Sequence, residues 1–560
     1  MRKTQKNRAS RSGLESDKFS PRLIYLSCPF PDRRIDLVFF KREVEVETPG
    51  RASALASKGA MAAGVIGAGY VAGRAMAVSA SLSEPRRPFE WRPERGKSVL
   101  LKRANVIDVV RGQVLKERGV LFKDGQVTGV LATRDVEKAQ ADTVIDCQGL
   151  FLIPGLINCH CHPLMPGSFV SPGVILSVKR QAVRNFEECA LRGITTLRDT
   201  SSLSRIIQDV SGRIEAFDML GPRIVSCGPV IGARGGYPDF SRQLPGWLAE
   251  KYGDMTIYAD TPDEARDAVR RSVEQGARFI KIFFDDRSLF FGRKPLNVMD
   301  DETVKALLDE AHRLGRRVAV HQSEVEGFRR AVRLGVDDFE HVPMDGVLED
   351  EDIAAFMAGD HCITPTASVA MALGVAPDGH PSRLDPVVES MQRQREKMAR
   401  RDFPAVAEAS MVKSNRKTAD LYLSGKAEGA KFNSMLFDNM LFIEAIETAK
   451  PNVGKLIEAG ARVCCGNDGG VPLLYPALLL GEMETMSLLG MPNADILRSA
   501  TVNAARLLDM QDELGTLEAG KLADMVVLSA NPLEDIRAID RIEGVFRSGT
   551  LLVKGARLII

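Results

Sequence analysis

Six residues of kinds that bind metal ions stand at or near the ends of apolar, strand-like segments. His160 and His162 close the segment GLFLIPGLINCHCH, and their spacing of two puts both side chains on one face of a strand. A single histidine at a strand end is more often packed and hydrogen-bonded than bound to a metal, so one such position means little. The full set is four histidines, one aspartate and one lysine: His160, His162, Lys281, His321, His341 and Asp468.

Lys281 is the member of this set that is hardest to explain as ordinary packing. It lies inside the apolar run RFIKIFF, and a charged amine buried among apolar side chains is costly unless it is paired. Imidazole nitrogens and carboxylate oxygens are ligands that Zn²⁺ prefers. Residues of these kinds at the ends of several strands therefore predict a metal site.

The elements that must position these residues alternate along the chain. Segments such as ITTLRD and RRVAVH have the composition of buried strands, whereas TPDEARDAVRRSVEQG has a Thr cap, an early Pro and a Gly stop typical of a helix. Eight strands can be counted from PGLINCHCH to ARVCCGNDGG, mostly joined by helices. This pattern predicts an α/β protein with a (β/α)₈ TIM-like barrel over residues 151–513, whose strand ends would carry the active groups.

The remaining segments predict further parts. Short β-rich runs over residues 96–150 and 514–560 predict a small composite β-sandwich built from both sides of the barrel. A charged, Met-rich and apparently helical insertion covers about 375–449. Residues 1–95 are expected to be a poorly structured leader with a signal-like apolar run at 59–73, which is shorter than the about 20 residues that span a bilayer.

Composition limits the class of protein. The 560-residue chain has a formal net charge of +1, so it lacks the basic character expected of a nucleic-acid-binding protein. Its nine cysteines include no CxxC pair, which suits a reducing compartment and a cytoplasmic location, or export if the run at 59–73 acts as a signal. Cys159 and Cys161 are expected to point outward from the barrel. No clear membrane partner is predicted, and a homo-oligomer is a possible assembly.

Several segments together resemble the amidohydrolase superfamily, in particular its imidazolonepropionase-like and prolidase-like branch. The resemblance runs from about residue 98 to 560 and leaves out the insertion. The segments that carry it are IPGLINCHCH, GITTLRD, GPRIVSCGPVI, ARFIKIFF, EAHRLGRRVAVH, GVDDFEHV, RVCCGNDGG, SATVNAARLL and LGTLEAGKLADMVVL.

This resemblance implies a site with two divalent metal ions, for which zinc is the first expectation. It implies that His160, His162 and Asp468 hold one ion and that His321 and His341 hold the second. Lys281 would be carboxylated by CO₂ and bridge both ions. A hydroxide shared by the two metals would attack the substrate, and Asp468, as catalytic residue, would take its proton and deliver it to the leaving nitrogen.

Three departures from the family pattern fall where substrate should be recognised. His321-Gln322-Ser323 stands where prolidase-like members usually have HAH, Gly235-Gly236-Tyr237-Pro238 replaces GGHG, and Asp285-Asp286-Arg287 replaces a Gly-rich turn. Tyr237 and Arg234 are therefore candidates for binding a substrate carboxylate, although ordinary polar loop contacts explain them equally well.

The function predicted is hydrolysis of a C–N bond in a small amide or dipeptide, in the manner of a prolidase-like dipeptidase. A cyclic-amide hydrolase of the imidazolonepropionase kind and a heterocycle deaminase are alternatives. Glu324, three residues after His321, keeps the deaminase open, whereas Lys281 argues against it. A catalytically dead scaffold is the alternative outside enzymes. His312 and His361 are expected to be structural, and His380 cannot be placed.

Overall fold

A computed structural model of the chain describes residues 93–554, with gaps at 166, 168–177, 238–253, 288–294, 370–384 and 472–473 and with most of 408–438 left out. Almost all of the expected leader, including the run at 59–73, lies outside the described residues, as does His380. No helix in the described ranges is long and apolar enough to cross a membrane.

Seven buried strands form two parallel sheets. One sheet has the order β6-β7-β8 and the other β11-β12-β13-β14. Each strand is short and all of its residues are buried, as expected where both faces of a sheet are covered. The strands are β6 (Leu156–Cys161), β7 (Ile194–Asp199), β8 (Arg223–Ser226), β11 (Ile280–Phe283), β12 (Val318–His321), β13 (Asp338–Glu340) and β14 (Cys362–Thr364).

Backbone hydrogen bonds connect the two parallel sheets at both junctions. Arg278 N donates to Ser226 O at 2.9 Å, which links β8 to the start of β11. On the other side, residues 463–469 lie between β14 and β6, since Cys464 N bonds Ile363 O and Cys159 N bonds Cys465 O, both at 2.8 Å. The chain thus has a TIM-barrel-like α/β fold.

The eighth predicted strand differs from its expected form. Residues 463–469 pair with their neighbours only through isolated bridges, at Val463 and Gly469. Two glycines interrupt this stretch, at positions 466 and 469, a third follows it at 470, and Asp468 has a φ of +50°, which extended backbone does not allow. The segment therefore curls at the end that carries Asp468.

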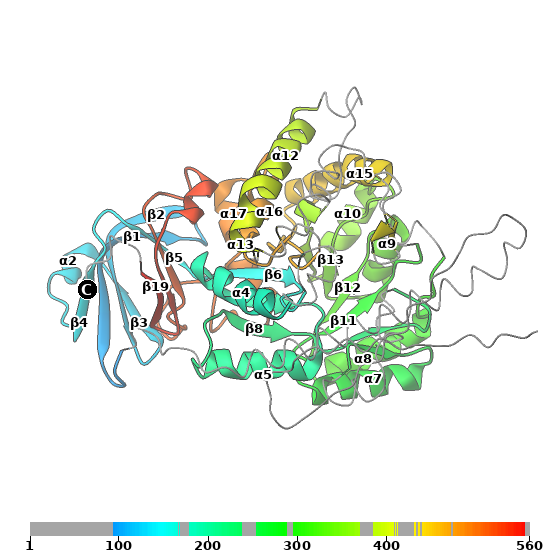
Figure 1. Ribbon diagram of the computed structural model, residues 1–560, viewed down its shortest axis with the longest axis horizontal. Coiled ribbons are helices and arrows are strands. Elements are labelled where there is room, and N and C mark those ends of the chain that lie inside the picture. Colours follow the sequence, from blue (N-terminus) through cyan, green and yellow to red (C-terminus); the bar gives the residue numbers. More distant parts are fainter. Residues whose placement is uncertain are drawn as a thin grey trace, which may run out of the picture. The chain divides into compact units, whose positions relative to one another are not determined.

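Helices cover the strands, as Figure 1 shows for α4, α5, α7 and α8. Their starts follow local signals: Thr261 accepts a hydrogen bond from Glu264 N at the start of α7, and Asp300 accepts one from Thr303 N at the start of α8. The crossover helices are α4 (Val178–Leu191), α5 (Ser204–Glu215), α7 (Pro262–Glu274), α8 (Asp301–Arg313), α9 (Val325–Leu334), α10 (Asp350–Met357) and α15 (Asn439–Glu458).

The segment after α16 (Leu479–Leu488) forms two short helices, α17 (Asn493–Ser499) and α18 (Val502–Leu507), with a break between them. The break frees the carbonyls of Ser499 and Ala500 to accept hydrogen bonds from Cys465 N and Ile157 N, at 3.0 and 2.9 Å. An additional parallel pair, β9 (Val230–Gly232) and β10 (Thr256–Tyr258), also precedes α7.

The insertion is described in part. It contains α12 (Pro386–Lys397), a π-helical turn at Met398–Asp402 and α13 (Phe403–Val406), followed by a small hairpin of β15 (Lys431–Phe432) and β16 (Met435–Leu436). The start of α15 completes it, and α16 (Leu479–Leu488) follows residues 463–471. The described part is mainly helical.

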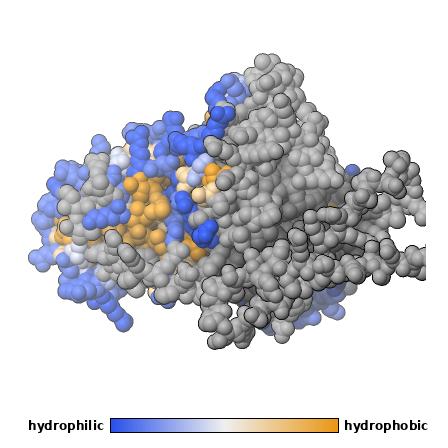
Figure 2. Space-filling model, in the orientation of Figure 1, coloured by the Kyte–Doolittle hydropathy of each residue, from blue (hydrophilic) through white to orange (hydrophobic). Residues whose placement is uncertain are grey.

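A separate sheet has the order β19-β18-β17-β5-β1-β2-β3, with β4 beside β1. Its strands come from both ends of the described chain, and their blue and red colours meet in Figure 1. Over β1–β4 the face in Figure 2 is mainly hydrophilic, and hydrophobic colour gathers near β5. The strands are β1 (Ser98–Asp108), β2 (Gln113–Lys123), β3 (Gln126–Leu131), β4 (Thr143–Asp146), β5 (Phe151–Pro154), β17 (Met525–Leu528), β18 (Ile542–Arg547) and β19 (Thr550–Lys554).

The antiparallel pairing of β5 with β17 joins the early and late segments of this sheet. The apolar run that was expected to be one strand is therefore two, β5 in this sheet and β6 in the barrel. Gly155 separates them, and a side chain there would lie 2.1 Å from Thr195 Oγ1. The domain limits at 150 and 514 remain predictions.

Candidate metal centre

The fold brings the six candidate ligands to the carboxyl ends of the barrel strands. Asp468 Oδ1 lies 3.1 Å from His162 Nε2 and 3.4 Å from His160 Nε2. The ring centroids of His160 and His341 are 4.9 Å apart, and those of His321 and His341 are 4.5 Å apart. Side chains from β6, β12, β13 and the segment 463–469 thus meet in one place.

Lys281 lies in β11 beside this group. Its Nζ is 4.0 Å from Oε1 of Glu340, whose Oε2 contacts His160 Nδ1 at 2.5 Å. The lysine side chain is 2 % exposed, and its Nζ has no hydrogen-bond partner among the described residues. Burial lowers the pKa of Lys281 to about 8, so a substantial fraction of this amine is neutral near physiological pH.

The donor set fits a divalent cation. Nitrogen or oxygen atoms from His160, His341 and Asp468 all lie within 4.8 Å of one another, and all three residues are buried. His162 Nδ1 is also buried without a hydrogen-bond partner among the described residues. Buried groups of this kind are costly unless something binds them, and four imidazoles with one carboxylate are a suitable set for Zn²⁺.

The carboxylate of Asp468 is charged at neutral pH. Burial acts to raise its pKa, but the adjacent His160 and His162 outweigh it and hold the pKa well below the usual range. His341 and Asp468 also have positive φ values of 69° and 50°. Non-glycine residues adopt this region rarely, and such strain is concentrated at functional sites.

A buried ion-pair network that was not predicted from the sequence holds the candidate ligand His160 in place. Arg198 contacts Glu340 and also lies 3.1 Å from Asp338, which pairs with Arg317 at 2.7 Å. Glu340 in turn accepts from His160 Nδ1 and leaves Nε2 for a metal. The acidic residues two apart in the buried strand DFE were the signal that could have found it.

We expect Arg198→Met to destabilise the fold strongly. The variant leaves Glu340 and Asp338 buried without this partner, and breaking a buried pair from one side costs about 3–5 kcal/mol. Arg393→Met is the control, because its pair with Glu389 is exposed on both sides and should be worth less than about 1 kcal/mol. Urea-unfolding midpoints measure both, and equal shifts would contradict this role for Arg198.

The two sequence departures that follow β11 and β12 form one hydrogen-bonded unit. Asp285 Oδ2 is 3.0 Å from His321 Nε2, and Asp285 Oδ1 accepts from Ser323 N at 2.7 Å. Burial acts to raise the pKa of Asp285, but His321 and Ser323 hold it below its usual value. On the other side of the site, Thr366 Oγ1 is 2.6 Å from His341 Nδ1. Asp285 thus fixes the orientation of the His321 ring, and Thr366 fixes that of the His341 ring.

Replacing Asp285 by Asn should weaken metal binding while leaving the fold intact. Loss of a carboxylate that orients a metal-binding histidine typically costs about 10- to 100-fold in metal affinity. Asp286→Asn is the matched control, since this neighbour has a side chain that is 61% exposed. Zinc retained against a competing chelator is the readout, and the same retention in both variants would rule out an orienting role for Asp285.

The two candidate substrate residues lie in different surroundings. The ring of Tyr237 is partly buried, with its centroid 4.9 Å from that of His321 and 5.6 Å from that of Phe283. Arg234 is half exposed and pairs with Asp260 at 2.5 Å and with Glu264 at 3.0 Å. The location favours Tyr237, whereas the charge of Arg234 is already compensated; substrate binding by either remains a prediction.

Other residues singled out from the sequence lie away from the candidate ligands. His312 in α8 pairs with Asp337 at 2.8 Å, and His361 directly precedes β14, at the opposite end from the site. Glu324 accepts hydrogen bonds from the backbone of Asp286 and Arg287 at 3.4 and 3.1 Å. Both histidines therefore have structural surroundings.

The expected orientation of one cysteine was wrong. Cys161 faces outward toward Cys189 in α4, as expected. Cys159 instead packs inside the barrel with Phe279 and contacts Cys464. The reason is a register shift in β6 between Asn158 and Cys161, because a bulge breaks the strict alternation of side chains along a strand.

Comparison with known proteins agrees with this fold. The amidohydrolase family model matches residues 151–552, and the chain belongs to this family. An ochratoxinase of Aspergillus niger is 22% identical over 512 residues, covering 86% of this chain and 90% of its own length. A 5'-deoxyadenosine deaminase of Methanosarcina acetivorans is 24% identical over 449 residues, covering 74% of this chain and 80% of its own.

Solved structures show the same fold. The crystal structure of a Xaa-Pro dipeptidase with bound methionine in the active site matches with a TM-score of 0.61 and 22% identity, covering 82% of this chain and 100% of that one. These likenesses support an enzyme that hydrolyses amide bonds, and they leave its substrate undefined.

Proposed function

We propose that the protein hydrolyses a C–N bond in a small amide or dipeptide with two divalent metal ions, zinc being the first expectation, bridged by carboxylated Lys281. The observation that carries this proposal is the buried Nζ of Lys281, which has no hydrogen-bond partner among the described residues and lies next to four histidines and Asp468. A neutral amine in this position can capture CO₂, and the carbamate formed is an oxygen ligand of the kind that divalent cations accept.

The ligands divide between two positions in this proposal. His160, His162 and Asp468 would hold one ion, and His321 and His341 the other. When bound, the ions would supply an activated water and polarise the substrate carbonyl. No other residue set among those described brings this many buried donors together.

The chain's own groups account for proton transfer. Asp468 is ionised at neutral pH, so its carboxylate can accept the proton of the attacking water at an oxygen and return it to the leaving nitrogen. Glu340 and Thr366 keep the rings of His160 and His341 oriented through their Nδ1 atoms. The partly buried ring of Tyr237, beside His321, would pack against the substrate.

A heterocycle deaminase is the second candidate, and the likeness to 5'-deoxyadenosine deaminase favours it. Glu324 would be its proton carrier, and burial raises the pKa of this group to about 8. However, Glu324 is held by the backbone of Asp286 and Arg287, and such a reaction does not need a carboxylated lysine between two metals. The hydrolase therefore explains more of the site.

The test is elemental analysis of the full chain, purified with zinc and bicarbonate, together with turnover of N-acyl amino acids, Xaa-Pro and Xaa-Arg dipeptides, cyclic imides and adenosine analogues. About two ions per chain with release of an amine and a carboxylate is the expected result. One ion with ammonia released from a heterocycle would establish the deaminase instead. A chain with no metal and no turnover would support a scaffold.

A further inference from the structure

A cavity of about 350 Å³ lies at the opposite end of the barrel from the metal centre. Two of its lining residues, His361 and Arg462, directly precede β14 and the segment 463–469, at the amino ends of these strands. Asp468 lies six residues further along the second segment, and a strand rises about 3.3 Å per residue. The cavity is therefore separate from the metal centre.

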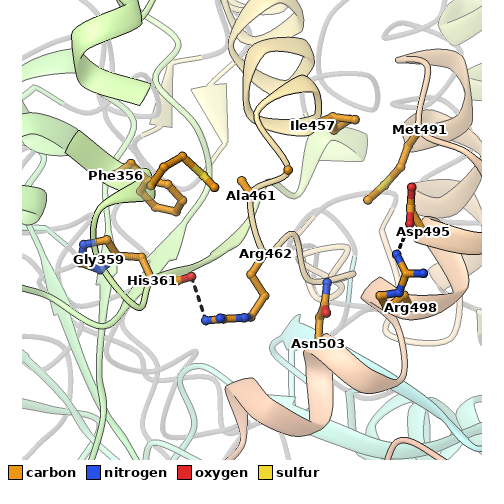
Figure 3. A pocket seen from close by; sticks show the side chains of 12 residues that line it. Phe356, Gly359, His361, Ile457, Ala461, Arg462, Met491, Asp495, Arg498 and Asn503 are labelled. Atoms are coloured by element: carbon orange, nitrogen blue, oxygen red, sulfur yellow. Dashed lines mark hydrogen bonds and ion pairs between the residues drawn. The ribbon is translucent and has the colours of Figure 1, made fainter. Parts of the chain in front are cut away.

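The lining is divided into an apolar and a polar side (Figure 3). Ile457 and Met491 lie on one side of the view, and Arg462, Arg498 and Asn503 lie on the other. Phe356 adds to the apolar wall. A cavity of this size, with apolar side chains on one side and convergent polar groups on the other, has the properties of a small-molecule site.

The floor of the cavity is built by close packing. The ring centroid of His361 lies 5.2 Å from the ring centroid of Phe339 and 5.2 Å from that of Phe356. Gly359 makes room for it, since a side chain there would meet His361 Nε2 at 2.1 Å. Burial lowers the pKa of His361, so this residue adds no positive charge to the cavity at neutral pH.

The charges around the cavity leave a net positive balance. Asp360 pairs with both Arg462, at 2.7 Å, and Arg506, at 3.0 Å. Asp495 pairs with Arg498. The lining itself carries two guanidinium groups, those of Arg462 and Arg498, and one carboxylate, that of Asp495. In the described part of the chain, the hydrogen bonds of Arg462 use only Nη1, so Nε and Nη2 remain for a ligand.

We infer that this basal pocket, lined by Phe356, Ile457, Arg462, Met491, Arg498 and Asn503, is a second binding site that takes a small amphipathic monocarboxylate. The apolar body of the ligand packs against Ile457 and Met491. Its carboxylate accepts charge-assisted hydrogen bonds from Nε and Nη2 of Arg462, the geometry for which guanidinium groups are best suited. This inference does not depend on the reaction at the metal centre.

The experiment is isothermal titration of the metal-loaded full chain with 4-phenylbutanoate and with the matched amide, 4-phenylbutanamide. We expect the acid to bind with a Kd of about 1 mM or lower and the amide at least about tenfold more weakly, because bonds to an ionised acceptor are roughly twice as strong. Equal affinity for the acid and the amide would overturn the assignment.

Variants locate the binding. Arg462→Gln should weaken binding of the acid about tenfold or more by removing the charged donor, and Ala461→Phe should abolish it by filling the cavity. Arg333→Gln is the control, an exposed arginine on α9 away from the pocket. Binding at the metal centre would persist in both pocket variants, so acid affinity unchanged in both, or no binding of acid to the unmodified chain, contradicts the proposal. Melting temperatures confirm that each variant is folded.

Discussion

Asp468→Asn should nearly abolish turnover of any substrate found in the panel. The amide keeps the shape of the side chain but can no longer accept a proton, and general acid–base catalysis alone contributes about 10²–10⁴-fold. The change also removes a negative charge that lies 3.1 and 3.4 Å from two imidazoles. Loss of a metal ligand would add to the loss of proton transfer.

The control for this variant is Asp512→Asn, an exposed carboxyl in the turn after α18. Turnover and metal content are measured on both variants with the same preparation of zinc and bicarbonate. A kcat within about tenfold of that of the unmodified chain would remove Asp468 from proton transfer. If the Asp468→Asn variant binds as much metal as the unmodified chain but has no turnover, Asp468 acts in catalysis beyond its role as a metal ligand.

The barrel strands and their helices were predictable from the sequence because their signals are local. The Thr261 cap with Pro262 fixed the start of α7, and the apolar run around Lys281 marked β11. The candidate ligands could be predicted from the same pattern of strands and helices, since residues at the carboxyl ends of parallel strands must meet at one end of a barrel. Distances between the imidazoles agree with this expectation.

The features that the sequence did not predict depend on contacts between distant segments. Cys159 turned inward because β6 contains a bulge, and α17 ends early because Cys465 and Ile157 need the carbonyls of residues 499 and 500. Arg198 and Glu340 are 142 residues apart in the sequence, so no local sequence pattern predicts that they pair. The basal pocket likewise joins α15, α17 and the start of β14.

Replacing Lys281 by Ala should remove the bridge that we propose between two metal ions. We expect metal content to fall from about two ions per chain to one or none, and kcat to fall by about 10³-fold or more, since metal-based charge stabilisation is worth several kcal/mol. Lys305→Ala, at an exposed position on α8, is the control. A small carboxylic acid such as propionate, which fits the space left by the side chain, should restore part of the activity of the Lys281 variant only.

The same lysine predicts how the metal-free protein regains activity. CO₂ adds only to the neutral amine, and burial places the pKa of Lys281 at about 8. At a fixed CO₂ pressure, the rate of reactivation with zinc should therefore rise about tenfold per pH unit below 8 and level off above it. Stopped reactivation samples taken between pH 6 and 9 measure this rate. A reactivation rate that does not change with pH across this range would rule out carboxylation of Lys281. Reactivation that proceeds equally well without CO₂ would rule it out as well.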